Sequence, residues 1–229
     1  MRPTVFVRAG MAGVLCAAML TGTGQAPAQA AAPLSIRGAD LSTLQRAEDL
    51  GARYSNQNGT QGDAMQILKA AGMNYVRLRV WVNPASGYNN QAKVVAFGKQ
   101  VKAAGLKLLV DFHYSDTWAD PGKQFTPAAW NGHSLSQLET DVYQYTFNVC
   151  NALKAAGATP DMVQVGNEIN GGMLWPVGKL TGGTGGWSNL AGLLISGYNA
   201  VKAVSSSTSS PNSPMFSRPR VGARQVAAS

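Results

Sequence analysis

Cysteine is scarce in this sequence of 229 residues, and its distribution limits the covalent structure. The two cysteines are Cys16 and Cys150. Cys16 lies in an amino-terminal segment that we expect to be removed, so Cys150 would remain alone. An intramolecular disulfide is therefore excluded even in an oxidising compartment, and we expect Cys150 to be a core residue on a helix.

Long hydrophobic runs are also lacking. The apolar run from Ala9 to Leu20 is shorter than the roughly 20 residues of a membrane-spanning helix. With Arg2 and Arg8 before it and Ala28-Gln29-Ala30 after it, this run has the pattern of a secretory signal peptide. We therefore expect residues 1–30 to be cleaved off and the protein to be secreted, with no membrane association afterwards.

A basic face of the kind that binds nucleic acid is not indicated, although the formal net charge is +8. Between Arg37 and Val204 there are 14 Lys and Arg against 11 Asp and Glu, which leaves 14 − 11 = +3. The other five cations lie near the two ends of the sequence. The sequence thus predicts no nucleic-acid partner.

What the sequence does contain is a strand followed by a helix, four times over. Strand patterns cover 35–41 and 74–82 and begin at 106 and 163; helix patterns run from about 62 to Gly72 and over 91–104, 135–156 and 187–204. Such repeats predict a parallel sheet, either doubly wound or a barrel. No glycine-rich phosphate fingerprint follows the first strand, which argues against a nucleotide-binding sheet.

Polar residues cluster where these strands end. Asp40, Arg79, His113 and Glu168 all fall at predicted strand ends or just past them. This is where a TIM-type (β/α)8 barrel has its active site. A full barrel needs about 250 residues, so the predicted fold class is α/β, of the (β/α)8 TIM-barrel type, truncated to about four βα units.

Two strands carry patterns that bear on the site. In an alternating strand Gln164, Gly166 and Glu168 share one face, so we expect Glu168 beside a glycine that leaves room. On the strand over 74–82, Arg77, Arg79 and Trp81 share a face. Burying two arginines there is costly unless acidic or polar groups meet them.

Four motifs in sequence order resemble glycoside hydrolase family 53, the endo-β-1,4-galactanases. They are Gly38-Ala39-Asp40, residues 76–81 (VRLRVW), residues 111–121 (DFHYSDTWADP) and residues 166–172 (GNEINGG). The resemblance covers Arg37 to Val204. It implies an eight-unit barrel that cleaves β-1,4-galactan or arabinogalactan of plant pectin with retention of configuration, and it implies Glu168 as the acid/base.

The same resemblance assigns the nucleophile to strand seven, for which this sequence has no counterpart. Whether this chain is catalytically active is therefore left open. Local substitutes for the nucleophile are Asp111, Asp116 and Asp120, with no spacing that fixes their distance from Glu168. No metal or other cofactor is predicted in this chain.

Other residues are predicted to bind the sugar or to support the carboxylates. Asn167 suits a hydrogen bond to the sugar 2-hydroxyl, and Asp40 is a further substrate-binding candidate. Arg79 would keep the nucleophile ionised, and His113 would bind sugar hydroxyls or orient a carboxylate. Candidates for stacking on sugar faces are Trp81, Trp118 and Trp175, for each of which core packing is an equally good interpretation.

Beyond Val204 the sequence becomes rich in Ser, Pro and Arg. This composition predicts a disordered tail over 205–229, which we interpret as out-of-frame sequence after the amino-terminal half of a hydrolase barrel over 31–204. Two alternatives stay open: a non-catalytic galactan-binding fragment, and a retaining β-mannanase or cellulase of the same barrel type. The stretch from Asp111 to Asp116 argues against the second.

Overall fold

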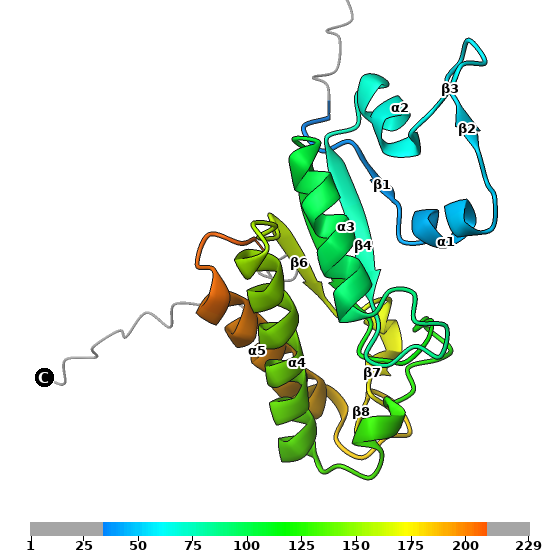
Figure 1. Cartoon of the computed structure of the whole chain (residues 1–229). Coiled ribbons are helices and arrows are strands. Elements are labelled where there is room, and N and C mark those ends of the chain that lie inside the picture. Colours follow the sequence, from blue (N-terminus) through cyan, green and yellow to red (C-terminus); the bar gives the residue numbers. More distant parts are fainter. Residues whose placement is uncertain (1–33, 210–229) are drawn as a thin grey trace, which may run out of the picture. The chain divides into compact units, whose positions relative to one another are not determined.

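The computed structural model describes residues 34–209, and its central element is a sheet of four parallel strands (Figure 1). The strand order is β1-β4-β5-β6. The strands are β1 (Gly38–Asp40), β4 (Tyr75–Val80), β5 (Lys107–Phe112) and β6 (Met162–Val165). The prediction of a parallel α/β fold built from four strand–helix units is confirmed. The predicted signal peptide and residues 210–229 of the predicted tail lie outside the described residues.

The predicted helices all form, within a few residues of the expected ends. They are α2 (Ala64–Ala70), α3 (Gln91–Ala103), α4 (Leu135–Ala155) and α5 (Gly186–Val204). The first three begin at polar caps, and in α4 Ser134 and Gln137 form a complete capping box. In the part of the chain that the structure describes, no helix is both long and apolar enough to cross a membrane.

Several short elements in the loops were not predicted. They are α1 (Leu44–Asp49), the pair β2 (Tyr54–Ser55) and β3 (Gln61–Gly62), the turns η1 (Ala128–Trp130) and η2 (Ile169–Gly171), and the pair β7 (Gly172–Met173) and β8 (Gly178–Lys179). Each is two to six residues long. Segments this short have too few residues for a hydrophobic period to be recognised in the sequence.

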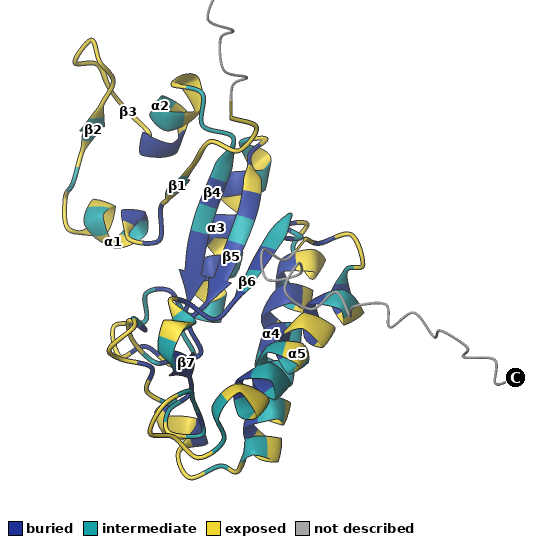
Figure 2. Cartoon of the chain, turned by 180° about the vertical axis from the view of Figure 1, so that it is seen from behind, coloured by how far each residue is buried: buried dark blue, intermediate teal, exposed yellow. Residues whose placement is uncertain are grey.

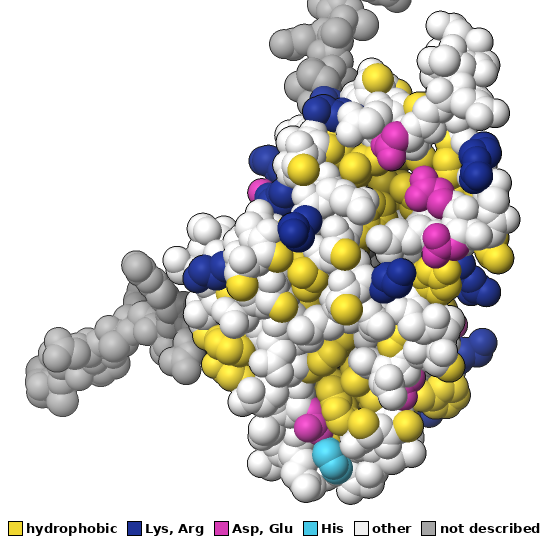
Figure 3. Space-filling model, in the orientation of Figure 1, with side chains coloured by type: hydrophobic (Ala, Val, Ile, Leu, Met, Phe, Trp, Pro, Cys, Tyr) yellow, Lys and Arg dark blue, Asp and Glu magenta, His cyan; other side chains and the backbone are white. Residues whose placement is uncertain are grey.

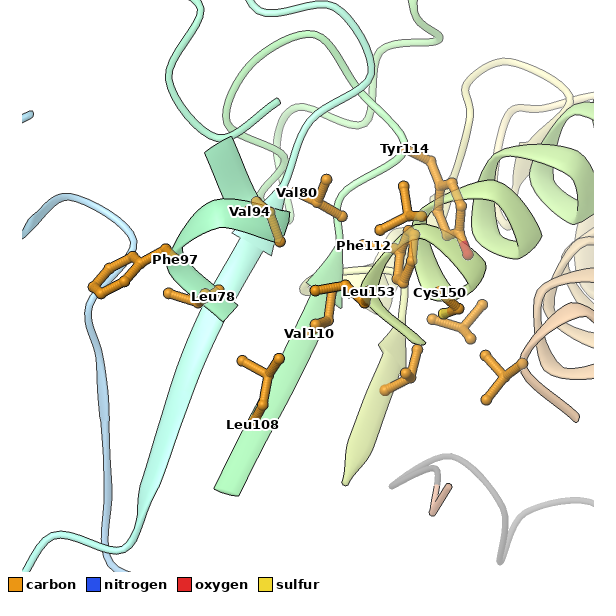
Figure 4. Packing of buried hydrophobic residues seen from close by; sticks show 14 of the residues in the cluster. Leu78, Val80, Val94, Phe97, Leu108, Val110, Phe112, Tyr114, Cys150 and Leu153 are labelled. Atoms are coloured by element: carbon orange, nitrogen blue, oxygen red, sulfur yellow. The ribbon is translucent and has the colours of Figure 1, made fainter. Parts of the chain in front are cut away.

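The three long helices, α3, α4 and α5, lie on one face of the sheet (Figures 1 and 2). Alternate residues of the strands pack beneath them, among them Leu78, Val80, Leu108, Val110 and Phe112 (Figure 4). On the other face of β5, Leu109 stays partly exposed. The helices thus cover one face of this strand.

Cys150 lies in this core on α4, as predicted, and burial raises the pKa of its thiol to about 12. The neighbouring contact between β5 and α4 is aromatic and polar. The rings of Phe112 and Tyr114 stack with centroids 5.5 Å apart, and the Tyr114 hydroxyl lies 2.7 Å from Oγ1 of Thr146. A thiolate is disfavoured at this position, so Cys150 serves packing rather than chemistry.

Order extends five residues past the predicted boundary at Val204. Thr208 is buried, and its hydroxyl donates to the carbonyl of Pro160 at 3.0 Å. Ser209 accepts from the Val163 amide at 3.0 Å and forms a parallel bridge with Met162. Residues 205–209 thus cover the start of the β6 edge.

We expect Gly197, on the buried side of α5, to tolerate a side chain poorly. A Cβ there would lie 2.5 Å from Cγ1 of Val165 and 3.0 Å from the Tyr114 hydroxyl oxygen. Gly197→Ala should lower the free energy of unfolding by about 1–3 kcal/mol, even though alanine favours helix. Urea denaturation followed by circular dichroism measures this change. Asn199→Ala on the exposed side of α5 is the control, and an unchanged midpoint for Gly197→Ala would contradict the prediction.

Candidate active site

Arg77 joins side chains from all four strands at the carboxyl end of the sheet. Its Nη1 pairs with Asp40, the last residue of β1. Its Nη2 donates to Oδ2 of Asp111 in β5 at 2.5 Å and to Oδ1 of Asn167, just after β6, at 2.8 Å. Asp111 is fully buried. The sequence analysis required acidic or polar partners for the two arginines of this strand. Two aspartates are present, and both form ion pairs with Arg77.

Arg79 has a different environment. Its guanidinium carbon lies 4.4 Å from the ring centroid of Trp118 and 5.3 Å from that of Trp81. Burial lowers the pKa of Arg79 below its usual value, and within the described residues its Nε has no hydrogen-bond partner. That Arg79 keeps the nucleophile ionised stays a prediction. Among the described residues Arg79 makes cation–π contacts with two predicted stacking residues, while Arg77 pairs with the acids.

His113 is buried between the same two tryptophans and Asp111. Its Nδ1 accepts from the Ala119 amide at 3.1 Å, which places the proton of the neutral ring on Nε2. Nε2 lies 3.0 Å from Oδ2 of Asp111, without the alignment of a hydrogen bond. Of the two predicted roles, orienting a carboxylate fits this buried position better than contact with a sugar.

Glu168 lies beyond the end of β6 rather than on it. The strand stops at Val165, and Gly166 (φ 86°) and Glu168 (φ 49°) both adopt positive φ. The predicted alternation of Gln164, Gly166 and Glu168 on one face is therefore wrong, because the turn interrupts the extended backbone. A left-handed conformation costs a non-glycine residue roughly 1–2 kcal/mol. Glu168 is exposed, and within the described residues its carboxylate has no hydrogen-bond partner.

Asn167, next to it, is buried and held at both ends of its amide. Oδ1 accepts from Arg77, and Nδ2 donates to the carbonyl of Ala119 at 2.7 Å. One Nδ2 hydrogen remains, since the amide nitrogen carries two. Sugar binding by Asn167 stays a prediction, and its observed contacts fix the backbone from which Glu168 projects.

Gln124 is a site residue that sequence reasoning missed. Its side chain is buried, and Nε2 lies within hydrogen-bond distance of the carbonyls of Asn167 (2.8 Å), Asp120 (3.1 Å) and Glu168 (3.3 Å). A buried donor facing these carbonyls stabilises the left-handed turn. Gln124 stands in a loop with no periodic pattern, so no signal in the sequence marks it.

The loop carboxylates named as possible nucleophiles have structural partners. Asp116 accepts from the amides of Asn83 (2.9 Å) and Ala128 (2.8 Å), and Asp120 accepts from Gly122 (2.8 Å). Asp111 is enclosed beside Arg77. Across residues 34–209, no group of three or more His, Cys, Asp or Glu is arranged to hold a metal ion.

A hollow opens beside Asp40, and Figure 3 shows hydrophobic side chains inside it between α1 and α2, with acidic side chains near its rim. Its volume is about 390 Å³. The lining includes Leu41, Leu44, Tyr54 and Ile67. Of the predicted stacking residues, Trp118 is 41% exposed, whereas Trp81 and Trp175 are half-buried.

The sequence that forms this site matches one family of enzymes. A family model described as glycosyl hydrolase family 53 matches residues 36–210. The chain belongs to glycosyl hydrolase family 53. The family recognised from the four motifs is thereby confirmed, and the match extends over the whole of the sheet.

Curated relatives carry matching names. The chain is 44% identical over 182 residues to the probable arabinogalactan endo-beta-1,4-galactanase A of Aspergillus fumigatus, covering 80% of this chain and 49% of that protein. It is 45% identical over 169 residues to the arabinogalactan endo-beta-1,4-galactanase of Thermothelomyces thermophilus, covering 74% and 49%. The chain thus spans about half the length of the curated relatives it matches.

Solved structures agree. A fungal beta-1,4-galactanase superposes with a TM-score of 0.71 at 44% identity, over 76% of this chain and 51% of that one. The glycoside hydrolase family 53 catalytic domain of Ignisphaera aggregans superposes with a TM-score of 0.69 at 40% identity, over 75% and 49%. The four-stranded sheet is therefore related to one part of a larger barrel.

We expect Arg77→Met to be strongly destabilising. The substitution would leave the buried carboxylate of Asp111 without its cation, which typically costs about 3–5 kcal/mol. Urea denaturation gives the change in free energy, with Arg46→Met on the exposed surface of α1 as the control. Adding Asp111→Asn to Arg77→Met should restore part of the loss. Equal midpoints for Arg77→Met and the wild type would contradict the central place of this ion pair.

Asp40 should make stability depend on pH in the acid range. Burial alone would raise its pKa, but hydrogen bonds from Ser42 and the charge of Arg77 outweigh burial and hold the pKa below its usual 3.8. Because the unfolded chain then binds protons more readily, the stabilisation is complete well above pH 3.8 and is lost as the pH falls through the folded-state pKa.

Asp40→Asn should therefore reduce the difference between urea midpoints measured at about pH 6 and about pH 3. Glu48→Gln, an exposed substitution on α1, is the matched control and should leave that difference unchanged. A steeper pH dependence in Asp40→Asn than in the wild type would show that the sign of the argument is wrong.

Proposed function

We propose that this chain carries the acid/base part of a secreted, endo-acting glycoside hydrolase that cleaves β-1,4-galactan, including the galactan of arabinogalactan. The observation that carries the proposal is the position of Glu168. Its exposed carboxylate follows the end of β6, directly after an asparagine held by Arg77 and Ala119. The substrate class rests on the names of the relatives.

In this proposal Glu168 donates a proton to the oxygen of the glycosidic bond as that bond breaks. A carboxylate partner on the opposite side of the sugar forms a covalent glycosyl intermediate, and Glu168 then takes a proton from the water that hydrolyses it. In the same proposal, Asn167 donates its remaining Nδ2 hydrogen to the sugar 2-hydroxyl. Retention of configuration follows from the two displacements.

The nucleophile is proposed to come from outside residues 34–209. Within that range Asp111 is buried beside Arg77, and the loop aspartates bind backbone amides. Asp40 is the remaining carboxylate of the cluster, one-third exposed and paired with Arg77. Asp40→Asn therefore tests whether a local residue performs this role.

The test compares variants of the chain on β-1,4-galactan by release of reducing sugar. The sequence has three glutamates, Glu48, Glu139 and Glu168, so Glu48→Gln and Glu139→Gln are matched controls. We expect Glu168→Gln to lower turnover by about 10²–10⁴-fold, because general acid–base catalysis contributes that much, and the controls to keep wild-type activity.

An azide rescue experiment tests whether Glu168 is the acid/base. Azide replaces water in the second displacement, so it should restore turnover of an aryl β-galactoside by Glu168→Ala, since such a leaving group needs no proton. Failure of azide to act, with galactan hydrolysis unaffected by Glu168→Gln, would refute the assignment. A wild-type chain that retards in a galactan gel without releasing sugar would instead identify a non-catalytic galactan-binding protein.

A further inference from the structure

The loop between β5 and α4 contains a segment, residues 120–126, that is bonded to the loop after β6, and we call this segment the strap. Asp120 and Lys123 close its first half with two backbone hydrogen bonds of 3.0 and 2.9 Å. In its second half Phe125 forms a parallel bridge with Trp175, and the backbone N–H of Trp175 donates to a strap carbonyl at 2.8 Å. These contacts fix the strap beside the loop that follows β6.

Gln124 is the strap residue that reaches the turn at Glu168. Its side chain is buried, and Nε2 donates to the carbonyls of Asn167 and Glu168 at 2.8 and 3.3 Å. These carbonyls belong to the two peptide groups on either side of the Glu168 α-carbon. Because the orientations of two flanking peptide planes define φ and ψ, Gln124 fixes the direction in which the Glu168 side chain leaves the backbone.

The backbone conformation of Glu168 requires such support. Its φ of 49° and ψ of 43° are left-handed, a conformation that glycine adopts readily, as Gly166 does at φ 86°. Glycine has no carboxylate, so a residue that supplies one here depends on its neighbours to impose the conformation. Nε2 of Gln164 donates to the Gly166 carbonyl at 3.0 Å, and Gln124 binds the next two carbonyls. Side-chain amides of two glutamines thus hold three consecutive carbonyls.

We infer that Gln124 is a positioning residue for proton transfer, which acts by directing the carboxylate of Glu168. The inference rests on the proposed function, because that function makes Glu168 the acid/base. Gln124 is itself buried, so it acts through Glu168 rather than on the sugar. Proton transfer should therefore depend on Gln124, whereas binding of galactan should not. A displacement of about 1 Å in a reacting group can lower a rate about 10²-fold.

Hydrolysis of β-1,4-galactan by Gln124→Met tests the inference, because methionine keeps the approximate size of the side chain and removes the donor. We expect kcat to fall about 10–10²-fold with KM nearly unchanged. Thr126→Val is the control within the strap, since the Thr126 hydroxyl donates to the Trp175 carbonyl at 3.0 Å instead of to the turn. This control should keep wild-type kcat. A wild-type kcat in Gln124→Met would overturn the inference.

Two further measurements separate positioning of Glu168 from a general loss of structure. An aryl β-galactobioside with an activated leaving group needs no proton in the first displacement, so Gln124→Met should leave kcat/KM for this substrate unchanged. In a Glu168→Gln background, Gln124→Met should lower galactan hydrolysis no further, because a residue that acts only through Glu168 has no effect once that carboxylate is gone. Equal losses on both substrates, or losses that multiply in the double variant, would contradict the inference.

Nuclear magnetic resonance of the chain with ¹³C-labelled glutamate tests the contact without hydrolysis. The ¹³Cα and ¹³Cβ shifts of Glu168 report its left-handed backbone. Gln124→Met should move them and leave those of Glu48 and Glu139 in place. If Gln124→Met does not fold, Gln124→Asn, which keeps a buried amide one methylene shorter, should give the same change.

Unchanged Glu168 shifts in the folded variant would overturn the inference whether or not the chain is active. A wild-type chain that hydrolyses no galactan, in which Gln124→Met still moves the Glu168 shifts, would refute the proposed function and leave the conformational role of Gln124 intact. The two failures are thus distinguishable.

Discussion

The guanidinium of Arg77 is the contact on which the site depends. It reaches Asp40 of β1, Asp111 of β5 and Asn167 after β6, so one side chain fixes the relative positions of four strand ends. A planar guanidinium suits this task, because its fork of donors holds several acceptors at set angles. Since Asp111 is buried, loss of the Arg77 guanidinium would leave its carboxylate as an unpaired charge inside the protein, which is strongly destabilising.

A second set of hydrogen bonds fixes the backbone at Glu168. Asn167 is held on one side by Arg77 and on the other by the Ala119 carbonyl, while Gln124 binds the carbonyls on either side of the Asn167–Glu168 peptide. The left-handed backbone of Glu168 is sustained by these neighbours. The carboxylate itself stays exposed while its backbone is held rigidly. Proton transfer to a bound substrate requires this arrangement.

The sequence was informative where a periodic pattern or a motif was long. The strand alternation around Arg77 predicted a strand of the sheet, and the pattern over 135–156 predicted a helix that packs on it. The pair Asn167-Glu168 predicted the position of the site. Tertiary contacts decided the rest. Which of Arg77 and Arg79 meets the acids depends on Asp40 and Asp111, far away in the chain, and Gln124 acts through carbonyls 43 and 44 residues further on. The turn at Gly166 broke an alternation that the residue types alone would have continued.

The partial cover of β6 by Ser209 makes the two borders of the sheet unequal. Within the described residues, β1 pairs only with β4, so its outer row of peptide groups is available while the start of β6 is occupied. Two chains related by a two-fold axis and joined through β1 would pair antiparallel. Barrel closure requires a parallel neighbour at that same border, so self-association through β1 and completion of the barrel would compete for one row of hydrogen bonds.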